Sequence, residues 1–122
     1  MSLPHDTLTA AIAANVAAAL AEDIGPGDAT ASLLEDHPEC AYLLCKEECV
    51  VAGRPWFDAS HRALDPDVRI HWHCQEGDHV AQGTVIATLQ GRSRALVSAE
   101  RTSLNFLQTL SGTATVTAQY VA

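Results

Sequence analysis

Three polar side chains in the last third of the chain have the types and spacing to bind an anion. Arg101, Asn105 and Gln108 lie at i, i+4 and i+7, so on a helix they share one flank. The planar guanidinium of an arginine donates parallel hydrogen bonds to a carboxylate or phosphate, and such a charge-assisted pair contributes roughly 1.5–3 kcal/mol. The pattern is compatible with an anion-binding face, although the same stripe is more often the solvated outside of an amphipathic helix.

The helix that carries this flank is marked by apolar side chains. Val97, Leu104, Leu107 and Leu110 share one broad arc at helical spacing, which predicts the face that packs on the core. Glu100 falls inside the same arc, where burying an unpaired carboxylate is costly. We therefore expect Glu100 to have a partner, either a cation or a backbone N–H of the first helical turn.

Periodicity and turn residues predict the other elements. An alanine-rich helix capped by Asp6 is expected to run to Glu22, closed by Gly25-Pro26-Gly27. The further elements expected are two strands joined by a bend or bulge within Ala41–Ala52, a short helix opened by Gly53-Arg54-Pro55 and closed by Leu64-Asp65-Pro66-Asp67, strands over Val68–Gln75, Val85–Gln90 and Ser93–Val97, and the helix of Arg101. This order indicates an α+β class, with helices against a mainly antiparallel sheet.

The end of the chain, Gln119–Ala122, is expected to continue a helix. It has no glycine cap, basic last turn or proline. We interpret this ending as a cut inside a longer protein.

Length and charge narrow the classes of function. A chain of 122 residues has room for one domain with a modest core. Seven basic and fifteen acidic residues give a formal net charge of −8, which argues against binding nucleic acid or an anionic membrane through a basic face. No uninterrupted apolar run reaches the roughly 18 residues of a membrane span. Because Met1–Asp6 lacks the features of a secretory signal, we expect a cytoplasmic protein.

Other chemistry-bearing residues carry weaker patterns. His71 and His73 alternate on one face of a predicted strand, with His79 beyond the next turn, but no third ligand is evident and no metal site is predicted. The four cysteines are expected to be thiols because the cytoplasm is reducing. Their spacing does not match a structural zinc site. The segment Glu76–Ile86 resembles the hairpin of lipoyl and biotinyl carrier domains, but the only lysine, Lys46, is expected in a strand region rather than at a hairpin tip.

Several motifs together resemble one enzyme family. The specific part is the run Glu100–Gln108 followed by Leu110–Thr115, and Glu22–Thr30 is similar to an early acidic turn of that family. Further matching positions are Gly53, Phe57, Trp72, Glu76-Gly77-Asp78, Val80, Gly83 and Gly91. The chain thus resembles the quinolinate phosphoribosyltransferases, the carboxylating nicotinate-nucleotide pyrophosphorylases, from about Leu20 to Val121. It departs from them at Thr113, where the family more often has isoleucine.

The resemblance implies a fold and a reaction. Residues 1–122 would be the amino-terminal domain, a hammerhead-like α/β sandwich with helices on one face, ending in helices that lead into a C-terminal α/β barrel absent from this chain. Such enzymes transfer a phosphoribosyl group from phosphoribosyl pyrophosphate to quinolinate, giving nicotinate mononucleotide, carbon dioxide and pyrophosphate for NAD biosynthesis. Magnesium accompanies the donor in the full-length enzyme, and no cofactor is expected on this domain.

The resemblance also implies a site shared between subunits. Arg101 would contact a carboxylate of quinolinate across a homodimer, with Glu100 and Asn105 near the mouth of the site, while the catalytic residues would lie on the barrel. The isolated chain is then expected to be inactive. An alternative is a stand-alone interaction module of the same fold.

Overall fold

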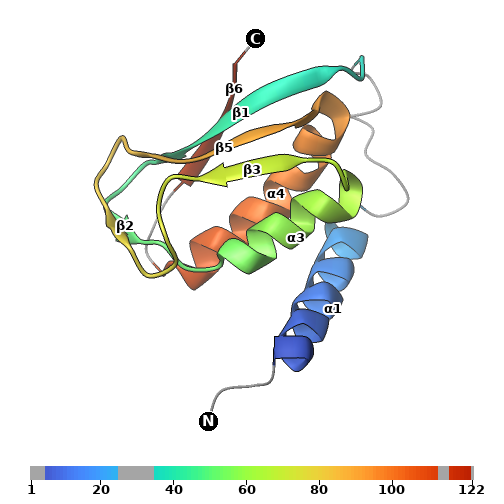
Figure 1. Ribbon diagram of the computed structural model, residues 1–122, viewed down its shortest axis with the longest axis horizontal. Coiled ribbons are helices and arrows are strands. Elements are labelled where there is room, and N and C mark those ends of the chain that lie inside the picture. The colour runs from blue at the N-terminus through green and yellow to red at the C-terminus, as the bar shows by residue number, and fades with distance from the viewer. Residues whose placement is uncertain (1–4, 25–34, 113–115, 122) are drawn as a thin grey trace.

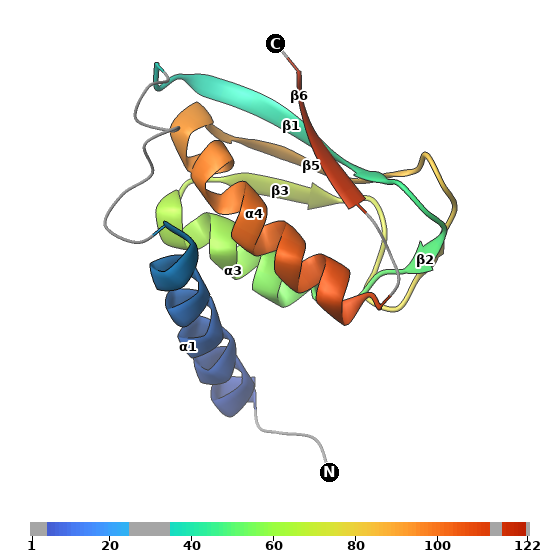
Figure 2. The same cartoon turned by 180° about the vertical axis from the view of Figure 1, so that it is seen from behind.

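The computed structural model describes residues 5–24, 35–112 and 116–121. Its elements, all but β4 labelled in Figures 1 and 2, are α1 (His5–Ile24), β1 (Pro38–Cys45), β2 (Cys49–Val50), α3 (Arg54–Leu64), β3 (Arg69–Trp72), β4 (His79–Val80), β5 (Val85–Arg92), α4 (Ser93–Leu110) and β6 (Val116–Val121). The class is α+β, as the sequence predicts.

The larger sheet has four antiparallel strands in the order β3-β5-β1-β6, and β2 and β4 form a separate pair. Helices α3 and α4 lie together on one face of the larger sheet, and α1 lies beyond them (Figures 1 and 2). The expected bend between two strands lies at Lys46 and Glu47, between β1 and β2. The register of β1 against β5 also shifts between Leu43 and Leu44, an irregularity that the sequence did not predict. The sandwich is therefore open, with helices on one side only.

Alternation along the strands builds the main core. Ala41, Leu43 and Cys45 of β1 are buried toward the helices, and Leu44 between them is only partly covered. The helices supply Phe57 from α3, with further buried side chains from α4. The buried cluster comprises Ala41, Leu43, Cys45, Cys49, Val51, Phe57, Val68, Val80, Ile86, Ala87, Leu89, Leu96 and Leu107.

A second, smaller core holds α1. Ile12, Val16 and Leu20 are buried at i+4 spacing, and the partly buried side chains packed against them include Trp56 of α3 and Phe106 of α4. Within the described residues, Asp6–Ile24 is long and apolar enough to cross a membrane by length and composition alone, with a mean hydropathy of 1.3. The sequence-based exclusion concerned uninterrupted apolar runs, and this helix is interrupted by polar residues such as Asn15. Its alanines raise the mean hydropathy, and one helix that meets this criterion is weak evidence for a membrane span.

The start of α3 depends on a glycine. Gly53 has a φ of 103°, and a Cβ there would lie 2.9 Å from Cδ1 of Leu110. Pro55 occupies the first turn, where its missing N–H costs no helical hydrogen bond. The helix ends at Leu64 before Asp65-Pro66, so both predicted boundaries of α3 are confirmed.

Two predicted elements are wrong. Ser93–Val97 is the first part of α4 and not a strand, because Leu96, Ala99 and Ser103 already follow helical spacing from its first turn. The residues near the end of the chain form strand β6, paired with β1, and not a helix. A strand needs no glycine cap, so the argument that the ending is a cut helix loses its premise.

The buried face of α4 differs from the predicted arc. Leu107 is buried, but Val97 and Leu104 are only partly covered and Leu110 is 44% exposed. The buried residues of the helix are Ser93, Leu96, Ala99, Thr102, Ser103 and Leu107. Small alanine, serine and threonine side chains allow close helix packing, which an arc drawn from large apolar residues alone does not reveal.

Candidate functional site

The side chains predicted to bind an anion lie along α4. Arg101 and Asn105 are exposed, and Gln108 is partly covered and has other contacts. Arg101 is thus carried near the middle of an 18-residue helix rather than on a loop. A helix fixes the position of a functional side chain more closely than a loop does.

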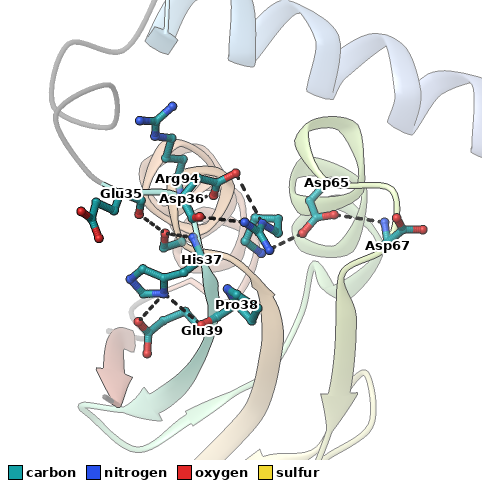
Figure 3. A network of polar contacts seen from close by, with 10 residues as sticks. Glu35, Asp36, His37, Pro38, Glu39, Asp65, Asp67 and Arg94 are labelled. Atoms are coloured by element: carbon teal, nitrogen blue, oxygen red, sulfur yellow. Dashed lines mark hydrogen bonds and ion pairs between the residues drawn. The ribbon is translucent and has the colours of Figure 1, made fainter.

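The start of α4 is held by a polar network (Figure 3). The Ser93 hydroxyl donates to the carbonyl of Glu35 at 2.8 Å and accepts from the backbone N–H of His37 at 3.1 Å. The backbone N–H of Ser93 donates to the carbonyl of His37 at 2.8 Å. A carboxylate oxygen of Asp36 accepts from the backbone N–H of Arg94 at 3.4 Å, near the positive end of the helix dipole. Residues 35–37 therefore fix where the helix begins.

Two side chains extend this network across the end of the sheet. Arg92 donates from its guanidinium to the carbonyl of Asp36 at 2.8 Å, and its Nε lies 3.4 Å from the Asp36 carboxylate. The buried carboxylate of Asp65 accepts from the backbone N–H groups of Arg92 at 3.0 Å and Asp67 at 3.1 Å. Three distant segments therefore meet at the entry to α4.

Helix α1 is joined to α4 immediately beside Arg101. The hydroxyl of Thr102, which is 1% exposed, donates to the carboxylate of Asp23 at 2.7 Å. Asp23 lies in the last turn of α1, so this bond ties the end of that helix to the residue after Arg101. A charged acceptor strengthens a hydrogen bond, but Asp23 is exposed, so water weakens this one.

Asn105 borders a hollow between α1, α3 and α4. The hollow has a volume of about 490 Å³, and Glu22, Asp23 and Trp56 are among its other lining residues, whereas Arg101 is not. Its two carboxylates would repel a dicarboxylate ligand. The structure therefore does not bring Arg101 and Asn105 into one pocket.

Glu100 lies where helical spacing predicts, half-buried against the core, but its expected partners are wrong. It sits in the middle of α4, so it cannot cap the first turn. Among the residues that the structure describes, no cation lies within ion-pair distance of its carboxylate. Glu100 borders a small cavity, which His61 and Ser103 also line. The cavity volume is about 10 Å³, enough for one water molecule at most.

His61 is a buried titratable group that sequence reasoning missed. Its side chain is 5% exposed, its ring centre lies 4.8 Å from that of Phe57, and burial lowers its pKa to about 4, partly offset by the nearby Asp65 carboxylate. The ring is therefore neutral near pH 7. Nothing in its sequence surroundings distinguishes it from an exposed helical histidine.

The predicted thiols are confirmed, and the fold brings two of them together. All four cysteines are free, and the sulfurs of Cys45 and Cys49 lie 3.7 Å apart. Burial is the main cause that raises the pKa of Cys49 to about 11 and also raises that of Cys74. Thiols with a raised pKa are poor nucleophiles at neutral pH.

The other residues considered for chemistry lie away from Arg101. His71 is exposed on β3 and His73 is exposed directly after it. Nε2 of His79 lies 2.8 Å from a carboxylate oxygen of Glu48. Lys46 is exposed in the bend after β1, and not within a strand as expected. The predicted turn at 25–27, most of the acidic motif 22–30 and the departure at Thr113 lie outside the described residues.

Comparison with known proteins identifies the family. The model of the N-terminal domain of quinolinate phosphoribosyl transferase matches residues 28–111, more than half of the chain. The chain belongs to this family. The fold also matches the nicotinate-nucleotide pyrophosphorylase from Francisella tularensis with a TM-score of 0.84 and 34% identity, covering 91% of this chain and 39% of that one.

Two curated relatives agree with this assignment. The chain is 40% identical over 102 residues to the chloroplastic carboxylating nicotinate-nucleotide pyrophosphorylase of Arabidopsis thaliana, covering 81% of this chain and 29% of the relative. It is 42% identical over 103 residues to a probable carboxylating nicotinate-nucleotide pyrophosphorylase of Synechocystis, covering 84% and 35%. The chain therefore spans about a third of the length of these relatives and corresponds to one domain of them.

Proposed function

We propose that this domain completes the quinolinate site of a carboxylating nicotinate-nucleotide pyrophosphorylase, an enzyme of NAD biosynthesis. In this proposal Arg101 binds a carboxylate of quinolinate at the barrel of a second subunit in a homodimer. The family match and the similarity to enzymes of that name support the reaction, and the position of Arg101 supports the role of the domain.

The observation that carries the proposal is a guanidinium held on a rigid helix without a carboxylate partner. Among the described residues, no acidic side chain forms an ion pair with Arg101, whereas Arg92 pairs with Asp36. An exposed and uncompensated arginine remains able to form a bidentate pair with a ligand. The network at the start of α4 and the Thr102–Asp23 bond hold the helix on both sides of it.

In this proposal the domain contributes a positive charge that binds the substrate, and the reaction itself takes place on the barrel. Quinolinate carries two carboxylates, and a net charge of −8 on this chain opposes its approach, so the attraction must be local. Arg101 supplies one fixed positive charge, and the remaining cations and the catalytic residues belong to the barrel. A guanidinium offered across a subunit boundary also makes the site complete only in the dimer.

The proposal also covers the magnesium ion of the full-length enzyme and the cellular compartment in which the enzyme works. Magnesium would neutralise the pyrophosphate of the donor as it leaves. The described residues contain no group of three or more His, Cys, Asp or Glu side chains that could hold a metal, so they do not fit this ion and no step is assigned to it here.

We place the enzyme in the cytoplasm.

The test is Arg101→Ala in a protein that joins this domain to a barrel. Loss of one bidentate pair should raise KM for quinolinate roughly 10- to 150-fold, from 1.5–3 kcal/mol of lost interaction. Arg62→Ala, which removes an exposed arginine from α3, is the matched control and should leave KM unchanged. Equal kinetics for Arg101→Ala and the control would remove Arg101 from the site and favour an interaction module.

A further inference from the structure

The face of the sheet opposite the helices presents two histidines. β3 is an edge strand (Figure 1), and its half-buried Ile70 and Trp72 alternate with the exposed His71 and with the exposed His73 directly after the strand. The backbone N–H of His73 still donates to the carbonyl of Ile86 on β5 at 2.8 Å. The two imidazoles therefore lie side by side, one on β3 and one on the residue that follows it. α3 and α4 lie on the other face, so this side is remote from the helices that form the proposed substrate site.

The separation of the two rings matches that of a chelate. Their centres lie 4.7 Å apart with an angle of 65° between the planes. If two imidazoles share one ion at nitrogen-to-metal distances of about 2.0–2.1 Å, with angles between right-angled and tetrahedral, their centres lie roughly 4.5–5 Å apart. The observed separation of the two rings lies within this range.

A neighbouring hydroxyl orients one ring. Nε2 of His73 lies 2.8 Å from Oγ1 of Thr88 on β5. In the tautomer that donates Nε2–H to this oxygen, Nδ1 keeps its lone pair for a metal, and a second hydrogen-bond partner of this kind is usual for metal-binding histidines. The backbone of His71 pairs with that of Thr88, so all three side chains belong to one corner of the open face.

We propose that His71 and His73 chelate a divalent transition-metal ion, with water at the remaining positions. Imidazole nitrogen suits Ni²⁺, Cu²⁺ and Zn²⁺, and Cu²⁺ should bind most tightly of the three. Within the described ranges no group of three or more metal-binding side chains occurs, so the site has two protein ligands. Arg69 on the same strand opposes a cation, whereas the net charge of −8 favours one at long range.

The experiment is a calorimetric titration of the 122-residue chain with NiCl₂, in a buffer that does not bind metals. We expect one ion per chain, and at least about tenfold weaker binding in His71→Asn and in His73→Asn. Thr88→Val should weaken binding less than either. His37→Asn is the control, since His37 is exposed and directly precedes β1, which β5 separates from β3 in the sheet.

Proton NMR of the imidazoles supplies an independent readout. Paramagnetic Ni²⁺ should broaden the ring signals of His71 and His73 before those of His79 or His37. Because both substituted positions are exposed, urea unfolding should confirm that each variant remains folded. The proposal would be overturned if His71→Asn or His73→Asn left the Ni²⁺ affinity unchanged, or if His37→Asn lowered the affinity equally. It would also be overturned if the line broadening began at another histidine. None of these outcomes depends on Arg101 or on enzyme activity.

Discussion

The two apolar cores of the domain differ in size and in what they hold. The main core joins both sheets to α3 and α4 through thirteen buried side chains, whereas only Ile12, Val16 and Leu20 are buried in the cluster that docks α1. Opening free energies vary within a protein according to such local packing. The comparison indicates a rigid platform that carries Arg101 and a more weakly attached helix beside it.

Phe57→Ala should produce the largest effect because it opens a cavity in the main core. Phe57 is 1% exposed, and its ring centre lies 5.2 Å from that of Trp72 in an edge-on arrangement. We expect a loss of about 3–5 kcal/mol in the free energy of unfolding, measured by urea denaturation. A loss below that of a substitution in the α1 cluster would contradict the distinction between the two cores.

His61 packs against Phe57 of the main core and should make the free energy of unfolding depend on pH in the acid range. Its folded pKa of about 4 lies below the ordinary value of 6.5, so the unfolded chain binds the proton first as the pH falls. The contribution is fully present above pH 6.5 and is lost toward pH 4, a change of about 3 kcal/mol.

The measurement is urea unfolding at pH 7 and pH 4.5 for the wild type and His61→Gln. Comparing the two proteins removes the contribution of carboxylates that titrate in the same range. The variant should show the smaller fall in stability. Parallel pH profiles would mean that His61 is not kept neutral by the fold.

Val16→Ala addresses the smaller core. Val16 is 2% exposed, and removing its two methyl groups should destabilise the docking of α1 by about 1–2 kcal/mol. Amide hydrogen exchange should then accelerate in α1 by roughly 5- to 30-fold, while the amides of β1 and β5 keep their rates. Equal acceleration in the sheet would show that α1 unfolds only with the rest of the domain.

Thr102→Val should have the smallest effect, since it removes one hydrogen bond between the two regions. We expect about 1 kcal/mol, seen as faster exchange in the last turn of α1. Thr109→Val, at an exposed position of the same helix, is the matched control. A double-mutant cycle with Asp23→Asn measures the coupling, and zero coupling would exclude the bond as a link between α1 and α4.

Local patterns predicted the elements whose signals are local. Strict alternation identified the strand that contains Ile70 and Trp72, and Gly53 with Pro55 marked the start of α3. Helix α1 also lies where periodicity places it, because its apolar residues repeat every four positions. The first strand was predicted from its residue types, and it begins at Pro38, before the predicted segment Ala41–Ala52.

Elements that depend on distant partners were missed. Val116–Val121 becomes a strand by pairing with β1, more than seventy residues earlier, and no nearby residue shows this. The start of α4 is fixed by Asp36, 58 residues away, so the segment from Ser93 was open to either interpretation. The site was predictable to the extent that Arg101 is exposed on a helix, but helical spacing could not reveal that Asn105 borders an acidic hollow.

The position of β1 in the sheet has a consequence for how this chain folds during its translation. Both neighbours of this strand, β5 and β6, are translated after it, and the second of them ends at Val121. A nascent chain that has left the ribosome only as far as α4 therefore exposes one edge of β1 with unpaired backbone groups. Such edges template association with other chains, so slow elongation before β6 emerges should favour aggregation over folding.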